Sequence, residues 1–183
     1  GLGDVYKRQH SLSTTVLSAD YEQEEGEVIV TIKARRGGNA RNWRVPMEVV
    51  YGIRADGTVT VRLTGRFDGD FGYRFWQEVP RIGTTLRLPE SFGRVTYCAY
   101  GPGESYCDSK QQCRRDVFTD DVDAMSFPYE CAQECGNRTG VRWAEVTDAK
   151  GRGLCFSGDG FEFSALPYTP HEIESATHAD ELP

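Results

Sequence analysis

Carboxylates are the side chains of this sequence whose spacing could best serve catalysis, because several fall together in turn-like stretches. Two carboxyl groups held roughly 5–10 Å apart can cleave a glycosidic bond, one as the acid and one as the base or nucleophile. Asp is also frequent in turns because its side chain bonds its own backbone. We interpret most of these groups as solvated loop acids. The candidates are Asp68, Asp70, Glu104, Asp108, Asp120 and Asp121.

Glu104 differs from the others because it directly follows a Gly-Pro-Gly turn. A Glu in such a place more often binds backbone amides or an Arg than transfers protons. The histidines are His10, His171 and His178, and neither a Gly-x-Ser-x-Gly elbow nor a Cys-Gly-x-Cys-Trp signature accompanies them. The sequence therefore assigns no catalytic residue to this chain.

The six cysteines permit three interpretations. Cys131 and Cys135 have CxxxC spacing, but a zinc ribbon usually has two close pairs of ligands, so we assign no metal ligand. The cysteine density is far below the ~8% of a disulfide scaffold, which favours scattered core or loop thiols. One or two disulfides stay an alternative for a secreted protein. The cysteines are Cys98, Cys107, Cys113, Cys131, Cys135 and Cys155.

Charge and hydropathy restrict the class of partner. The formal net charge of −7 disfavours nucleic acid, which binds basic surfaces. No run approaches the roughly 18 consecutive apolar residues of a membrane span, so we expect no membrane insertion. We expect a cytoplasmic protein and leave secretion open. The chain of 183 residues is long enough for one domain with a substantial core.

Alternation of apolar and polar residues is the dominant pattern and predicts half-buried strands. Ala55-Asp56-Gly57 predicts a hairpin turn between two of them, and residues 148–151 predict another. Thr169, Pro170 and Glu172 predict a short helix over residues 170–178 with a capping box. Antiparallel strands at near-regular spacing indicate an all-β sandwich. The expected strands cover residues 27–33, 45–53, 59–63, 82–88, 95–100, 141–143, 154–156 and 161–165.

The two ends of the sequence do not continue this pattern. Residues 1–9, GLGDVYKRQ, resemble a translated sequencing adapter, and we leave them out of the fold prediction. The other end stops without a closing strand. We therefore expect residues 10–183 to be a single β-sandwich domain, incomplete at its C-terminus.

Five short blocks follow one another in a distinctive order. They are VPRIG (residues 79–83), YGP with ESY and D (100–108), GNRT with VRW (136–143), FSA with Y (163–168) and ATH (176–178). In order and spacing they resemble the C-terminal β-sandwich domain of family 2 β-galactosidases. The resemblance extends from about Glu27 to His178.

This resemblance implies a galactose-mutarotase-like β-sandwich, the last domain of a multidomain hydrolase of β-galactosides such as lactose. In that family the two catalytic Glu residues lie in a (β/α)₈ barrel, together with Mg²⁺ and Na⁺ ions. We therefore expect this chain to hold no cofactor, to be inactive alone and to support the barrel of a homo-oligomeric parent. The residues that could shape the rim of the sugar site are Tyr100, Glu104, Tyr106, Glu134, Asn137 and Arg138.

Two alternatives remain open from the residues alone. The abundant aromatics, 11% of the chain, would suit a free-standing carbohydrate-binding module of the same fold, although aromatics in a sandwich more often pack in its core. The cysteines would suit a disulfide-bearing secreted interaction domain. Asn137-Arg138-Thr139 also fits an N-glycosylation sequon. These residues belong to the GNRT block of the family resemblance, which explains their presence better.

Overall fold

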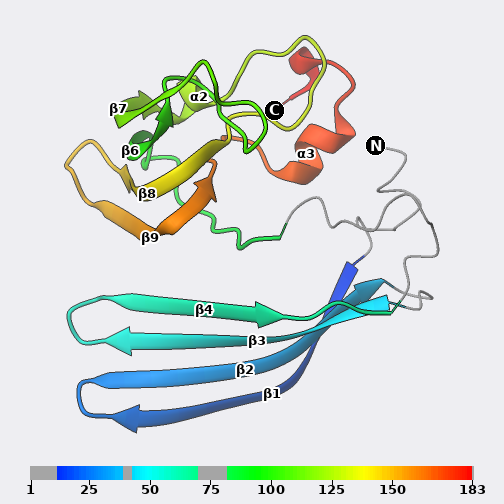
Figure 1. Ribbon diagram of the computed structural model, residues 1–183, viewed down its shortest axis with the longest axis vertical. Helices are drawn as coiled ribbons and strands as arrows, with labels where there is room; N and C mark the ends of the chain where they lie inside the picture. Colours follow the sequence, from blue (N-terminus) through cyan, green and yellow to red (C-terminus); the bar gives the residue numbers. More distant parts are fainter. Residues whose placement is uncertain (1–11, 39–42, 70–81, 183) are drawn as a thin grey trace. The chain divides into compact units, whose positions relative to one another are not determined.

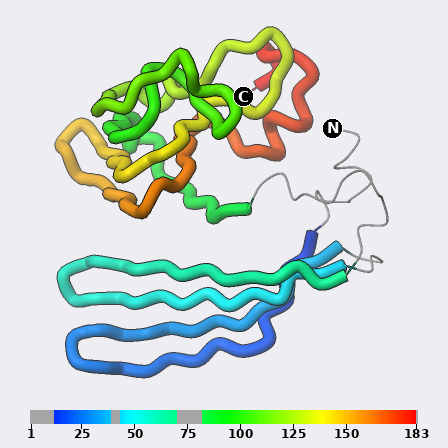
Figure 2. The backbone as a smooth tube through the Cα atoms, viewed as in Figure 1, coloured from blue at the N-terminus to red at the C-terminus, as the bar shows by residue number. Residues whose placement is uncertain are grey.

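The computed structural model describes residues 12–38, 43–69 and 82–182. The chain divides into two compact units, Gly1–Gly83 and Thr84–Pro183. Each unit contains one antiparallel sheet, which we call sheet A and sheet B (Figure 1). The backbone trace in Figure 2 shows that sheet A is built from consecutive hairpins. The predicted all-β class is thus confirmed. Whether the two units form a single domain is not tested by this division, and the single domain stays a prediction.

Sheet A contains five strands, four of them in sequence order. They are β1 (Leu12–Glu24), β2 (Glu27–Gly38), β3 (Trp43–Arg54) and β4 (Val59–Gly65), with the short β5 (Asp68–Gly69) also paired to β3. The predicted turn joins β3 to β4. Gly57 supplies its left-handed backbone, with φ of 89°, and the Thr58 N–H donates to Asp56 Oδ1 at 2.8 Å.

Alternation along the strands separates an apolar face of sheet A from a polar one. The register places Tyr51 of β3 opposite both Val30 of β2 and Val61 of β4. Much of this face is not enclosed, since Tyr21 is 79% exposed and Val61 is 52% exposed. Its side chains are Tyr21, Val28, Val30, Ile32, Val49, Tyr51, Ile53, Val59, Val61 and Leu63.

Sheet B has four strands in the order β7-β6-β8-β9. They are β6 (Arg94–Gly101), β7 (Arg114–Asp121), β8 (Arg138–Thr147) and β9 (Gly153–Phe163). Three buried apolar residues from each of β6 and β8 form the core with Met125. That core consists of Val95, Tyr97, Ala99, Met125, Val141, Ala144 and Val146.

Strand β7 forms one edge of sheet B, because β6 is its only partner among the described strands. On this strand the Val117 N–H donates to Oδ1 of Asp116 at 2.9 Å. At the other side of the sheet, β8 and β9 are joined by the predicted turn at residues 148–151. There Oδ1 of Asp148 accepts from the N–H groups of Lys150 and Arg152 at 2.8 and 2.9 Å.

Three short helical segments complete the second unit: α2 (Val122–Met125), α3 (Pro170–Ser175) and η2 (Ala179–Glu181). The predicted capping box of α3 is confirmed. The Glu172 N–H donates to Oγ1 of Thr169 at 3.2 Å, and the Thr169 N–H donates back to Oε2 of Glu172 at 2.6 Å. None of the helices in the described part of the chain is long and apolar enough to cross a membrane.

Three sequence-based expectations about elements need correction. The strand expected over residues 82–88 is absent, and this stretch has no regular structure. Leu88, the last apolar residue of the stretch, packs against the core of sheet B. The helix expected to reach His178 ends at Ser175, since Ala176 is extended with ψ of 136°. The two short runs expected over residues 154–165 are one strand, β9, ending at Phe163.

Candidate functional site

The turn loop, residues 101–109, follows β6 directly, and its backbone depends on glycine. A Cβ on Gly101 would lie 2.8 Å from Cε2 of Phe118 on β7, so a larger residue there would have to displace the Phe118 ring. Gly103 has a φ of 77°, which L side chains rarely adopt. These glycines therefore position the turn by which the chain leaves β6 and returns as β7.

Ser105 attaches this loop to the start of β8, and its side chain is completely buried. Its hydroxyl donates to the Tyr100 carbonyl at 2.9 Å and accepts from the Thr139 N–H at 3.0 Å. Its backbone N–H donates to the Asn137 carbonyl at 2.8 Å. Its carbonyl accepts from Nδ2 of Asn137, also at 2.8 Å. All polar groups of Ser105 are thus used inside the fold, as burial requires.

Glu104 binds the other side of the same junction. Its carboxylate accepts hydrogen bonds from the Tyr129 phenol and from the Gly136 N–H, the latter at 3.0 Å. The bond from Tyr129 also raises the pKa of that phenol, because a nearby carboxylate disfavours a phenolate. The expectation that Glu104 binds a backbone amide is confirmed. Its contacts hold two loops together.

Gly136 is the point at which the second of these loops turns into β8. Its φ is 73°, and a Cβ there would lie 2.5 Å from the Met125 carbonyl oxygen. A side chain would therefore meet both backbone strain and a backbone clash. The sequence block GNRT begins with this glycine because the close approach to α2 leaves no space.

Asn137 and Thr139 connect β8 to β9 through Glu162. Nδ2 of Asn137 donates to one carboxylate oxygen of Glu162 at 3.3 Å, and the Thr139 hydroxyl donates to the other at 3.1 Å. Asn137 is only 4% exposed, so a glycan has no access to its amide. The sequon is therefore structural, and Asn137 does not face solvent as a sugar-rim residue would.

Arg138 is the largest fully buried side chain of the described residues, at 1% exposure. Its Nε donates to the Tyr97 hydroxyl at 3.0 Å, and that hydroxyl donates to Oδ2 of Asp120 at 2.9 Å. Nη1 donates to the Gly136 carbonyl at 3.0 Å, and Nη2 lies 3.9 Å from Oδ2 of Asp120. A buried guanidinium needs such partners because unpaired it would be costly. We call Arg138, Tyr97 and Asp120 the buried arginine network.

The remaining rim candidates are less enclosed. Tyr100 is half-buried and carries the guanidinium of Arg115 at 4.9 Å and the ammonium of Lys110 at 5.6 Å over its ring. Tyr106 is half-buried, and burial, followed by Glu104 and Glu134, raises its pKa to about 12. Glu134 is exposed. Of the six candidates, Asn137 and Arg138 are thus buried, Tyr100, Glu104 and Tyr106 are half-buried, and Glu134 is exposed.

The other carboxylate candidates each make different contacts. Asp68 pairs with Nε of Arg44 at 2.7 Å, Asp120 belongs to the buried arginine network, and Asp121 is the N-cap of α2. Asp108 is exposed, and Asp70 lies outside the described residues. Among the residues that the structure describes, no group of three His, Cys, Asp or Glu side chains is arranged to hold a metal ion.

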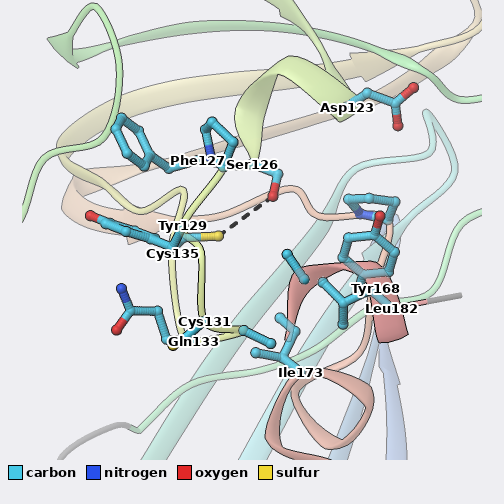
Figure 3. Close-up of a pocket in the computed structure, with 14 residues that line it drawn as sticks. Asp123, Ser126, Phe127, Tyr129, Cys131, Gln133, Cys135, Tyr168, Ile173 and Leu182 are labelled. Carbon is cyan, nitrogen blue, oxygen red and sulfur yellow. Dashed lines mark hydrogen bonds between the residues drawn. The ribbon is translucent and has the colours of Figure 1, made fainter. Parts of the chain in front are cut away.

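A pocket of about 280 Å³ lies beside Tyr129. Figure 3 shows Phe127, Tyr129 and Cys135 on one wall, with Tyr168, Ile173 and Leu182 on the other. The Cys135 thiol and the Ser126 hydroxyl are 3.5 Å apart, and all six cysteines are free thiols. Sequence reasoning missed this pocket, and the cluster Phe127-Pro128-Tyr129 was its only local signal.

Comparison with known proteins gives the same family over nearly the whole chain. The family model described as "Beta galactosidase small chain" matches residues 3–183. The chain belongs to the β-galactosidase small-chain family. A β-galactosidase of Halalkalibacterium halodurans is 31% identical over 175 residues, which cover 94% of this chain and 17% of the relative.

Two further curated relatives agree with this assignment. β-Galactosidases of Priestia megaterium and of Lactobacillus delbrueckii subsp. bulgaricus are 38% and 37% identical, over 58% and 71% of this chain. The chain spans only 10% and 13% of their lengths. The comparisons support neither a free-standing binding module nor a secreted interaction domain.

The small-chain family blocks in this sequence coincide with the contacts described above. The block at residues 100–108 supplies Glu104 and Ser105, and the block at 136–143 supplies Asn137 and Arg138. These two blocks lie far apart in sequence, yet their residues bond to one another directly. Part of the first block, residues 79–81, lies outside the described residues, as do the aromatics Tyr73, Phe75 and Trp76.

Proposed function

We propose that this chain is the non-catalytic C-terminal sandwich of a family 2 glycoside hydrolase, a β-galactosidase acting on lactose-type β-galactosides. The match over residues 3–183 to the β-galactosidase small chain carries the proposal. The short share of each relative that the chain spans, 17% in Halalkalibacterium halodurans, supports a division of labour with the rest of the parent. In this proposal the chain supports the catalytic barrel and forms part of the rim of the sugar site.

The chemistry of the carboxyl groups supports a non-catalytic role. A glycosidase needs one carboxyl group with a raised pKa to serve as the general acid. Wherever the pKa of a described carboxyl group is shifted, it is lowered, and backbone hydrogen bonds are the first cause. These groups are Asp56, Asp116, Asp148, Glu172 and Glu181.

The internal use of Glu104, Asn137 and Arg138 also restricts the rim. If the chain contacts the sugar, then Tyr100, Glu104, Tyr106 and Glu134 are the candidates that solvent reaches, and both carboxylate oxygens of Glu104 already accept hydrogen bonds. The Mg²⁺ and Na⁺ ions implied by the family resemblance do not fit here, since the described residues offer no metal cluster. Six free thiols support a reducing, cytoplasmic location for the parent.

Fragment complementation tests this function. The chain is expressed alone, and then together with the upstream catalytic part of the same reading frame. We expect no hydrolysis of a chromogenic β-galactoside by the chain alone and restored hydrolysis by the mixture. Turnover by the isolated chain would refute the non-catalytic role. Full activity of the catalytic part without this chain would refute the supporting role.

A further inference from the structure

The pocket beside Tyr129 is formed by three separate stretches of the second unit: residues 123–135, 167–173 and 179–182. Its volume of about 280 Å³ lies just below the roughly 300–1,000 Å³ of small-molecule sites, so it suits a single large side chain. None of the six rim candidates belongs to its lining. The pocket is therefore a separate feature of this unit.

The interior of the pocket is largely apolar. On one side, the Ser126 hydroxyl and the Cys135 thiol are 3.5 Å apart and pair with each other. The Tyr129 hydroxyl donates to Glu104, which is not part of the lining. The opposite wall consists of aromatic and aliphatic side chains (Figure 3): Tyr168, Ile173 and Leu182. A group that enters the pocket thus meets few free hydrogen-bonding partners, which favours an apolar group.

The surroundings of the pocket are acidic. The three stretches that form it contain six exposed carboxylates and neither Lys nor Arg. Figure 3 shows the carboxylate of Asp123 directed away from the Phe127 ring, so this charge lies at the edge of the pocket. A surface with charges of one sign favours a partner of the opposite sign. The six carboxylates are Asp123, Glu130, Glu134, Glu172, Asp180 and Glu181.

The combination of an apolar interior and an acidic edge fits an apolar side chain that has Lys or Arg beside it. Protein interfaces are commonly anchored by such a side chain in a pocket, with charged groups around it. A second copy of this chain is a poor source, because its net charge of −7 repels another copy. The parent is a better source, since the chain spans only 17% of the relative from Halalkalibacterium halodurans.

We propose that the pocket receives one apolar side chain from the catalytic part of the parent β-galactosidase. In this arrangement Asp123 and the neighbouring carboxylates pair with a Lys or Arg next to that side chain. The inference rests on the proposed function, in which the chain supports the catalytic part. It adds the place of contact and the chemistry of the partner segment.

The thiol of Cys131 can report whether the pocket is occupied, because it is exposed in this chain and belongs to the lining. The full-length parent and the isolated chain are treated with iodoacetamide in the native state, and alkylation is followed by mass spectrometry. We expect Cys131 to react at least about tenfold more slowly in the parent than in the chain. Cys107 and Cys155, exposed thiols outside the lining, are the internal controls and should change less.

A charge reversal in the full-length parent tests the acidic edge. Asp123→Lys should raise the rate of Cys131 alkylation by about two- to fivefold, the range expected for one surface ion pair. The matched control is Asp159→Lys, at a fully exposed carboxylate of β9, which changes the net charge equally and should leave the rate unchanged. Each rate is divided by that of the same variant of the isolated chain, which removes direct effects of the new Lys on the thiol.

Equal alkylation of Cys131 in the parent and in the chain would overturn the proposal. So would protection of Cys131 that Asp123→Lys leaves unchanged. Protection that develops in the isolated chain as its concentration rises would assign the pocket to a second copy and would also overturn it. If complementation succeeds while Cys131 is unprotected in the parent, only the docking pocket is refuted and the proposed function stands.

Discussion

The two sheets of this protein are stabilised in different ways, although both are antiparallel. Sheet B encloses six apolar residues of β6 and β8 together with the buried arginine network. Sheet A has long, regular strand ladders, but only Ala34 and Trp43 among its described apolar side chains are buried. Regular backbone pairing alone therefore does not build a core; sheet B gains its core from the loops and helices that cover its inner face.

The largest expected effect concerns the buried arginine network. Arg138→Ala should cost about 3–5 kcal/mol of unfolding free energy, because it leaves the carboxylate of Asp120 and the hydroxyl of Tyr97 without their cation. Urea unfolding of the chain measures it. The control is Arg142→Ala on the same strand, whose side chain is 57% exposed and which should cost no more than about 1 kcal/mol. Equal losses of unfolding free energy in Arg138→Ala and Arg142→Ala would contradict the expected difference between a buried and an exposed arginine.

Glycines with positive φ provide the next comparison. Gly136 and Gly103 have φ of 73° and 77°, but a Cβ at Gly103 would meet no atom within 4 Å. Gly103→Ala should therefore cost about 1–2 kcal/mol, from backbone strain alone. Gly136→Ala should cost a further 1–3 kcal/mol or so, because the Cβ overlaps the Met125 carbonyl. Thermal unfolding measures both, and indistinguishable melting temperatures would contradict the steric argument.

Valine truncation compares the two sheets directly. Val95 in β6 has no exposed surface, whereas Val61 in β4 is 52% exposed. We expect Val95→Ala to cost roughly 2–3 kcal/mol, since it leaves a cavity in a packed core. Val61→Ala should cost about 0.5 kcal/mol or less. A large cost at Val61, measured by the same urea unfolding, would mean that the apolar face of sheet A is covered in solution.

The smallest expected effect is the pH dependence of stability that arises from one hairpin turn in each sheet. Backbone hydrogen bonds lower the pKa of both Asp56 and Asp148 below 3.8. Each therefore stabilises the fold fully above pH 3.8, and that stability is lost as the pH falls through the lowered pKa. Asp148 also accepts two bonds from the Arg152 guanidinium, so Asp148→Asn should destabilise the chain more than Asp56→Asn.

Melting temperatures between pH 7 and pH 2 measure this effect. The difference between the wild-type chain and each Asn variant should be constant near neutral pH and should shrink at acid pH. Asp159→Asn, at a fully exposed carboxylate that lies 3.7 Å from Nη1 of Arg142, serves as the control. A difference that persists at pH 2 would show that the carboxylate charge is not the cause.

The sequence predicted those elements whose signals are local. The strands around Val30, Tyr51 and Tyr97 alternate clearly, and the turn at Asp56 and the capping box at Thr169 each lie within a few residues. Strands β1 and β7 were not predicted. The sequence of β7, RRDVFTDD, has charged residues at positions that face both sides of the sheet, so its periodicity is weak. Residues 82–88 alternate, yet a strand also needs a partner, and none of the described strands pairs with them.

The candidate site was predictable only in part, for a related reason. The position of Glu104 after a glycine turn indicated a bond to a backbone amide, and this is what the structure contains. The burial of Asn137 and Arg138 could not be read from the sequence, because such residues are mostly exposed and their partners lie more than 20 residues away. The pocket likewise depends on three stretches that meet only in the folded chain.

The bond between Asp116 and the Val117 N–H has a consequence for solubility. An edge strand with free backbone donors can recruit a strand from another molecule and so begin aggregation. On β7 the Asp116 carboxylate accepts from one of these donors, and its charge repels an approaching carbonyl group. The Asp116 side chain thus leaves β7 with one fewer free donor for a strand from another molecule.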